Sequence, residues 1–394
     1  MSERKIVKPD TQFIKNIKQN GGEDFKKCLQ CATCTSVCQL STEGNGFPRK
    51  QMLLVQWGLK DRLLEDPAPW LCFYCGDCSK NCPRKSNPGE TMMALRRYLT
   101  SQYDWTGISC LMYSSIFWEI GILLILASAI IFAFTIPNNF GFGLLSHSNP
   151  AAMKSVMLEK FAPIGMVDWG DRIMAGLLGV LLLSNVARMF SGLIKGQKIP
   201  FYLYITQIPY LIIQGLTQKS WKVCDSNESI KNWIRHLLLV SGYGIMFTLV
   251  VVFLPWFQIK DSSLHWTSFL GYYSTLVLLV TTVWILIDRL KKRTEMHRFS
   301  HFSDWLFPVM LLLAALSGIL LHLFRVRDLA MPTYITYVVH LAIVVPMLFV
   351  EVPFGKWGHL LYRPVAIYVA AVIKRASELQ NQANDAKKQA AVLI

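Results

Sequence analysis

Six long apolar stretches alternate with polar and basic connections over most of the chain. They cover residues 108–136, 168–194, 233–255, 268–288, 304–325 and 334–354. Each is long enough to cross the roughly 30 Å hydrocarbon core of a bilayer as an α-helix. The pattern therefore predicts a bundle of six transmembrane helices.

A seventh apolar stretch, "IPFYLYITQIPYLIIQGL" at 199–216, is shorter and less regular. It contains two prolines, Pro200 and Pro209, and two glutamines, Gln207 and Gln214. Proline interrupts a helix interior, and the amides are costly in hydrocarbon. We expect this segment to lie at the membrane interface or to dock a partner rather than to span the bilayer.

The first 104 residues are polar and rich in cysteine. Within them, "FPRKQMLLVQWGLKDRLLED" at 47–66 has apolar residues at helical spacing, which predicts a small helical domain. The expected fold class is therefore all-α. A small α-helical domain (1–104) precedes the membrane domain (105–364, with a cytoplasmic or interfacial loop at 195–232), and a polar tail (365–394) follows.

Composition supports a membrane protein: 53% of the 394 residues are hydrophobic and 16% are charged, whereas soluble domains have about 25% charged residues. The net charge is +15. Three of the connections between the apolar stretches hold only five lysines and arginines, counting Arg325 at the end of the fifth stretch, whereas connections 195–232 and 289–303 hold ten. By the positive-inside rule, these connections and both termini are expected on the cytoplasmic side of the cell's inner membrane. The same distribution argues against a nucleic-acid partner, and the first 25 residues show no secretory signal pattern.

Eight of the ten cysteines form two C-x2-C-x2-C-x3-C repeats. The first repeat is Cys28, Cys31, Cys34 and Cys38, and the second is Cys72, Cys75, Cys78 and Cys82. Such a run gives three thiolates to one [4Fe–4S] cluster and the fourth to another. The expected sets are thus Cys28, Cys31, Cys34 with Cys82, and Cys72, Cys75, Cys78 with Cys38.

Zinc and disulfides are the alternative interpretations of these repeats. A third cysteine three residues after each C-x2-C pair is superfluous for a tetrahedral zinc site, so two clusters are favoured. One departure is that Gln39 follows the first repeat where Pro83 follows the second. Cys110 and Cys224 lie outside the pattern and are expected to be inert thiols.

The histidines suggest a second kind of metal site, because an ionisable residue inside a bilayer is a functional candidate. His340 and His359 are 19 residues apart, roughly 28 Å if the segment is one helix, which would place them near opposite membrane faces. His322 closes the fifth apolar stretch and His236 opens the third. We therefore expect His236 with His359 to hold an inner haem, and His322 with His340 to hold an outer haem.

Other residues near these histidines leave alternatives open. His265 is the substitute ligand if His322 fails, whereas His147, His297 and His301 are expected to be solvated. Gly242 and Gly244, just after His236, could make room for a porphyrin or for close helix packing, and the sequence favours neither.

The motifs resemble those of known families. Residues 1–104 resemble the C subunit of heterodisulfide reductase, an α-helical ferredoxin domain. Residues 108–364, above all "VVHLAIVVPMLFVEVPFGKWGHLLYRP", resemble the dihaem cytochromes b that form the E subunit of heterodisulfide reductase and the gamma subunit of nitrate reductase. The fusion of both resembles the C subunits of quinone-interacting membrane-bound oxidoreductase complexes. One departure from the nitrate reductase gamma pattern is Met246, which stands where a second histidine would follow His236.

The resemblance implies electron transfer between menaquinol and cytoplasmic partners through two haems b and two [4Fe–4S] clusters. The implied partners are two flavin-containing proteins similar to the A subunit of heterodisulfide reductase (the A and B subunits of the quinone-interacting complex). Adenylylsulfate reductase of dissimilatory sulfur metabolism is the implied electron partner. Two rival functions remain: a C–E fusion that serves heterodisulfide reduction through another subunit, and a non-catalytic anchor for soluble reductases.

Acidic and basic residues in the apolar stretches are candidates for handling the protons of the quinone. Asp168, Asp171 and Arg172 enter the second stretch at its expected outer end, although ordinary boundary charges would look the same. Glu119 and Glu351 are alternative candidates toward the inner side.

Overall fold

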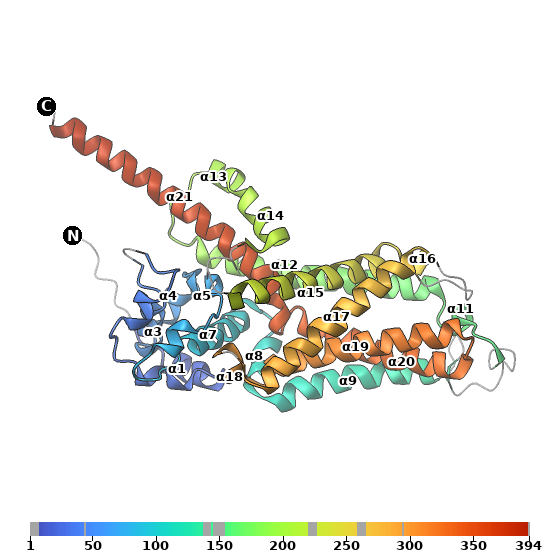
Figure 1. Ribbon diagram of the computed structural model, residues 1–394. Helices are drawn as coiled ribbons and strands as arrows, with labels where there is room; N and C mark the ends of the chain where they lie inside the picture. The colour runs from blue at the N-terminus through green and yellow to red at the C-terminus, as the bar shows by residue number, and fades with distance from the viewer. Residues whose placement is uncertain are drawn as a thin grey trace. The chain divides into compact units, whose positions relative to one another are not determined.

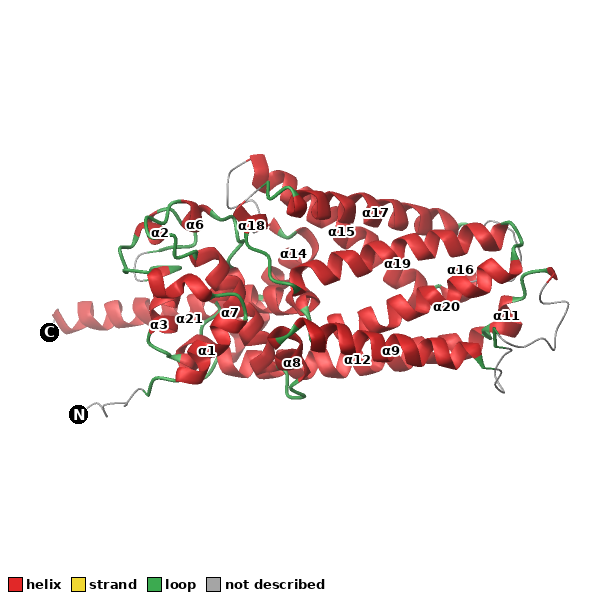
Figure 2. Ribbon diagram, turned by 90° about the horizontal axis from the view of Figure 1, so that it is seen from below, coloured by secondary structure: helices red, strands yellow, loops and turns green. Residues whose placement is uncertain are grey.

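The computed structural model describes residues 8–42, 45–136, 143–144, 154–219, 227–257, 265–293 and 295–392. Throughout these ranges every regular element is helical, which confirms the all-α fold class (Figure 2). The chain divides into two compact units. The first comprises Met1–Cys110, Leu182–Ile230 and Gly358–Ile394, and the second comprises Leu111–Leu181 and Lys231–Trp357. His147 and Cys224 lie outside the described residues.

The amino-terminal part of the first unit is a cluster of short helices around an apolar core. In chain order they are α1 (Thr11–Gln19), η1 (Glu23–Lys27), α2 (Thr33–Ser36), α3 (Arg49–Gln56), α4 (Lys60–Leu64), α5 (Ala68–Leu71), α6 (Asp77–Lys80) and α7 (Pro88–Tyr103). The Asp10 carboxylate caps α1 by accepting a 2.9 Å hydrogen bond from the Phe13 amide. The buried core includes Phe13, Ile17, Phe25, Met52, Val55, Leu63, Leu95 and Tyr98.

The two cysteine repeats share one backbone conformation. In each, the second residue after the first cysteine is left-handed, with φ of 59° at Gln30 and 55° at Tyr74. The residue after the second cysteine is left-handed too, with φ of 69° at Ala32 and 89° at Gly76. Short helix α2 or α6 follows and carries Cys34 or Cys78, the third cysteine of its repeat. The sequence repeat is therefore also a structural repeat.

The remaining segments of the first unit cover a second face of α5 and α7. The end of α12 (Ile164–Leu193) and α21 (His359–Val392) pack on this face, and α13 (Phe201–Thr206) and α14 (Ile208–Thr217) contact α21. Their shared core contains Trp70, Leu99, Tyr103, Met189, Leu193, Tyr362, Ala366 and Val369. Segment 199–216 thus forms two short helices, neither of which is among the six candidate spans. Its outward side is apolar and exposed, with Phe201 and Leu216 as its most exposed residues.

Six helices are long and apolar enough to cross a membrane, as predicted, which supports a multi-pass membrane protein. They are α9 (Ile116–Thr135), α12, Ile230–Val251 within α15 (Asn227–Val251), α17 (Thr267–Leu290), α19 (Ser303–Val326), and α20 (Ala330–Pro346) extended by η3 (Met347–Glu351). Within the second unit, α19 packs between α17 and α20, and α20 also contacts α9 (Figure 1).

Two of the expected helices are interrupted. The first stretch breaks at Ser115, whose extended backbone and hydroxyl cap the start of α9 and separate it from α8 (Ile108–Ser114). The last helix ends in π-helical geometry at Glu351, and a turn and the 3₁₀ helix η4 (Lys356–Gly358) precede α21. His340 and His359 are therefore not on one continuous helix, and the 28 Å estimate of their separation no longer applies.

Candidate metal centres

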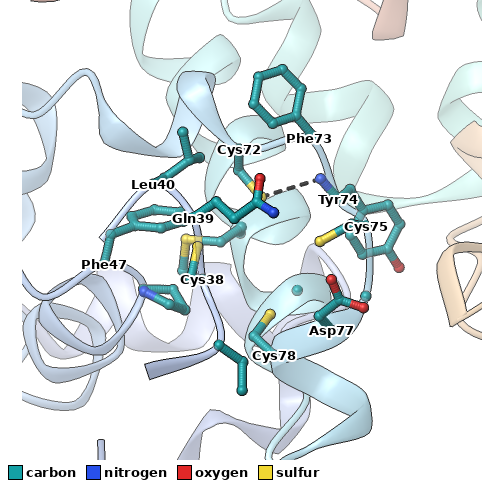
Figure 3. Close-up of a pocket in the computed structure, with 15 residues that line it drawn as sticks. Cys38, Gln39, Leu40, Phe47, Cys72, Phe73, Tyr74, Cys75, Asp77 and Cys78 are labelled. Carbon is teal, nitrogen blue, oxygen red and sulfur yellow. Dashed lines mark hydrogen bonds between the residues drawn. The ribbon is translucent and has the colours of Figure 1, made fainter. Parts of the chain in front are cut away.

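One predicted cysteine set surrounds a pocket in the first unit. Cys38, Cys72, Cys75 and Cys78 line it, and their sulfur atoms point toward the same space (Figure 3). The Tyr74 amide donates a 3.3 Å hydrogen bond to the Cys72 sulfur, an arrangement that the left-handed backbone at Tyr74 permits. Burial, and then the charges of Cys72 and Cys75, raise the pKa of the Cys38 thiol to about 11. Such thiols ionise readily only when a metal takes the thiolate.

The four cysteines of the other predicted set lie near enough for their charges to interact. Burial raises the pKa of the Cys34 thiol, and the charges of Cys28, Cys31 and Cys82 raise it further, so these four sulfurs are electrostatic neighbours. Cys82, from the second repeat, accepts a 3.4 Å hydrogen bond from the Ser86 amide. Thiolates are the ligands of four-iron clusters, so both donor sets fit. Within the described ranges, no three His, Cys, Asp or Glu side chains gather tightly enough to hold a single metal ion.

A buried network of charged side chains connects the second cysteine repeat to helix α7. Glu90 on α7 accepts a 2.6 Å hydrogen bond from the Tyr74 hydroxyl and pairs with Arg97 at 3.0 Å. Both side chains of the ion pair are less than a tenth exposed. Arg97 also donates to the Asn20 carbonyl at 2.6 Å. The network therefore ties the loop that carries Cys72 and Cys75 to α7.

Two arginines that the sequence analysis missed lie beside the same cysteine set. Arg96 on α7 donates to the carbonyls of Pro69, Trp70 and Cys72. Arg363 on α21 is 8% exposed and stacks on the Phe73 ring at 4.5 Å. Burial, and then the nearby Arg96 charge, lower the pKa of Arg363 to about 9, which leaves it cationic at neutral pH. Only its position near the end of the last apolar stretch marks it in the sequence.

His340 is positioned as an axial ligand would be. Its Nδ1 lies 2.9 Å from the Ser317 hydroxyl on α19, and its ring packs closely on Gly318. A hydrogen bond at one ring nitrogen sets the orientation of the other, as in many metal-ligating histidines. His340 therefore fits a haem-ligand role.

His322, its expected partner, has a different environment. Its Nε2 lies 2.6 Å from the Tyr272 hydroxyl on α17, and its Nδ1 lies 3.4 Å from Arg325. Ligation through Nε2 would require Tyr272 to move away, so His322 does not fit as it stands. The contact between Tyr272 and His322 could not be predicted from the sequence, because the two residues are fifty positions apart.

The other predicted ligands lie in different units. His236 belongs to α15 of the second unit, and His359 begins α21 in the first. Their pairing stays a prediction. Of the two nearby glycines, Gly242 serves close packing, since a Cβ there would meet α17 at Ser274 and Leu278. A Cβ at Gly244 would meet nothing within 4 Å.

The remaining histidines differ in burial. His265 and His301 are half-buried, and each Nδ1 contacts the hydroxyl two residues later, at Thr267 and Ser303. His297 is 3% exposed, so the expectation that it is solvated is wrong. It lies in α18 (Glu295–Arg298), where burial and the charges of Arg289 and Arg235 lower its pKa to about 4.

The candidate proton-handling residues fall into two groups. Asp168 pairs with Arg172 at 2.9 Å on the same helix face, as ordinary boundary charges do, and Asp171 is their neighbour on α12. Glu119 and Glu351, in contrast, are almost completely buried, and their carboxyl groups interact with each other. Carboxyl groups can take up and release protons, and these two are shielded from water. This pair is therefore the better placed of the two groups to hold a proton.

Comparison with known proteins assigns the amino-terminal domain. Residues 24–86 match the family model of the 4Fe-4S dicluster domain. The chain is 36% identical to a protein of Archaeoglobus profundus that is described as similar to the C subunit of heterodisulfide reductase. The match extends over 104 residues, which are 26% of this chain and 55% of the relative.

Two further relatives match the same region. One is the C subunit of the H(2):CoB-CoM heterodisulfide, ferredoxin reductase of Methanothermobacter thermautotrophicus (38% over 76 residues; 19% of this chain and 41% of the relative). The other is the C subunit of the ferredoxin:CoB-CoM heterodisulfide reductase of Methanosarcina mazei (32% over 86 residues; 22% and 52%). The chain spans about half the length of these curated relatives. No solved structure matches. The chain thus joins an iron–sulfur domain like the C subunit of heterodisulfide reductase to six apolar helices.

Proposed function

We propose that this chain is the membrane electron-transfer component of a quinone-interacting oxidoreductase complex, similar to the C subunits of quinone-interacting membrane-bound oxidoreductases. It would exchange electrons between menaquinol in the cytoplasmic membrane and flavoproteins in the cytoplasm. One observation carries the proposal: a single chain combines a dicluster domain with a six-helix membrane part in which a half-buried histidine, His340, is oriented by Ser317.

The chain's own residues hold and tune the redox groups. Two sets of four cysteines hold the [4Fe–4S] clusters, while His236 with His359, and His340 with His322 or its substitute His265, hold two haems b. When bound, these groups supply one-electron transfer. The protein ties the loop of the second cysteine repeat to α7 through the contacts of Glu90 and orients His340 through Ser317. The buried Glu119–Glu351 pair is the favoured acceptor for quinol protons.

The orientation and partners follow from the same proposal. Both termini would lie on the cytoplasmic side, where two flavoproteins similar to the A subunit of heterodisulfide reductase would dock on the dicluster domain. Adenylylsulfate reductase would be their electron partner in dissimilatory sulfur metabolism. The basic connections 195–232 and 289–303 support this orientation.

The test is to isolate the complex from native membranes, identify its protein components, and record iron content and optical difference spectra. We expect about eight non-haem irons and two low-spin b haems per chain, with the haems reduced by a menaquinol analogue. A preparation that contains the iron but no haem would refute electron transfer from quinol through haem and would favour the rival function, a non-catalytic anchor for soluble reductases.

Variants separate the histidine roles. His340→Phe should lose one haem and keep both clusters, whereas the loop variant His301→Asn should keep both haems. His322→Phe and His265→Phe then identify the second ligand, since only one of them should lose the same haem. Retention of both haems in His340→Phe would contradict the assignment.

A further inference from the structure

Two cations lie beside one cysteine set: Arg363 is buried and Arg96 is half-buried. Arg96 donates a hydrogen bond to the carbonyl of Cys72, and Arg363 stacks at 4.5 Å on the ring of Phe73, the next residue. The cation that acts on Cys31 in the other set is Arg49, which is exposed to solvent. Because water and salt screen exposed charges far more than buried ones, the two sets experience different electrostatic fields.

The two arginines are held in different ways. Arg96 is fixed by three backbone carbonyls, including that of Cys72 itself, so it is part of the loop's architecture. Arg363 comes from a distant part of the sequence and approaches through its stacking on Phe73, the residue next to Cys72. Its burial alongside another cation is electrostatically costly, because the two guanidinium groups repel each other. An anion at the cysteine set would offset that cost.

A four-iron cluster with four thiolate ligands is such an anion, and reduction adds one more negative charge to it. A fixed positive charge nearby stabilises the reduced state more than the oxidised state, which raises the reduction potential. The effect is strongest where the cation is buried and near the cluster.

We propose that Arg363 is a tuning residue that raises the reduction potential of the cluster held by Cys72, Cys75, Cys78 and Cys38 above that of the other cluster. It acts through its charge and not as a ligand. The inference rests on the cluster assignment of the proposed function. It also explains why the segment after the last span packs against the dicluster domain: α21 brings this charge to the cluster.

The experiment is a potentiometric titration of the purified full chain, followed by electron paramagnetic resonance of the reduced clusters. Arg363→Gln should lower the midpoint potential of one cluster and leave the other unchanged. Arg363→Met removes the same charge but suits an apolar site, so it provides the same test if the Gln variant folds poorly. Arg363→Lys keeps the charge and should retain most of the potential.

The matched control is Arg375→Gln, which removes a cation from the same helix about 18 Å further along. Arg375 is exposed and pairs with Glu378, so its loss should leave both potentials unchanged. A Cys78→Ser variant identifies the signal of the affected cluster. The inference is overturned if the neutral Arg363 variants leave both potentials unchanged, or shift them no more than Arg375→Gln does.

Iron analysis distinguishes this failure from failure of the proposed function. If the wild-type protein contains about eight non-haem irons but the Arg363 variants do not change the reduction potentials, only the tuning role is refuted. Wild-type protein without clusters would refute the proposed function itself.

Discussion

Arg97 neutralises the buried Glu90 carboxylate, so replacing it with methionine should destabilise the dicluster domain strongly. In Arg97→Met, the Glu90 carboxylate would keep its hydrogen bond from Tyr74 but lose the guanidinium 3.0 Å away. The Asn20 carbonyl would lose its donor as well. Breaking a buried ion pair from one side costs about 3–5 kcal/mol, because it leaves an uncompensated charge.

That cost can be measured as the rate at which iron is released to an excess of chelator. Release requires local opening of the domain, and its rate follows the population of the open form when opening is fast. A loss of about 3 kcal/mol raises that population by about a hundredfold, at roughly 1.4 kcal/mol per factor of ten. The assay follows the visible absorbance of the clusters at fixed temperature in detergent.

Two further variants test the reasoning. Arg62→Met removes an exposed cation from α4 and should release iron at nearly the wild-type rate. The double variant Arg97→Met/Glu90→Gln has no orphaned charge and should recover most of the stability. If Arg97→Met releases iron within twofold of Arg62→Met, the ion pair does not stabilise the domain as described.

Three more predictions follow from single residues. Gly76→Ala should destabilise the second cysteine loop by about 1 kcal/mol, because φ is 89° there; Ala32→Gly should relieve a similar strain in the first, and both are checked by the same iron-release assay. Because burial lowers the pKa of His297 to about 4, the unfolded chain binds a proton there before the folded chain does. Stability should therefore fall as pH drops from about 6.5 to about 4, by at most about 3 kcal/mol, and His297→Asn should reduce that acid sensitivity in thermal unfolding. If His322 is a haem ligand, the Tyr272 hydroxyl must move away from its Nε2 when haem binds, so Tyr272→Phe should leave the haem content unchanged. Loss of a haem in this variant, measured by optical spectroscopy, would show instead that the Tyr272 hydroxyl is needed for haem binding.

The features that sequence alone predicted are those encoded by composition over many residues or by strict spacing. Run length and hydropathy placed all six spans, since a bilayer demands a minimum apolar length. Pro200 and Pro209 indicated an interrupted segment, and the structure has two short helices there, α13 and α14. Cysteine spacing predicted two sets of ligands, and the structure brings Cys38 together with the second repeat.

Features that depend on backbone detail or distant contacts could not be read in this way. The break after Glu351 falls beside the apolar residues Val352 and Phe354, so the last apolar stretch resembled one continuous helix. Tyr272 at His322 and Arg363 at Phe73 are tertiary contacts without a local pattern. Gly242 was ambiguous because a glycine can admit a ligand or a neighbouring helix, and only the position of α17 distinguishes the two.

The first unit is assembled from three separate stretches of chain, which has a consequence for biosynthesis. Trp70, Leu99 and Tyr103 emerge early from the ribosome, but Tyr362, Ala366 and Val369, which cover them, are made last. Synthesis proceeds at roughly 5–20 residues per second, so this apolar face stays exposed for on the order of tens of seconds before the residues that bury it are made. During that interval the nascent domain is open on one side, so chaperones and the machinery that delivers iron and sulfide have access to it before the final helix closes over it.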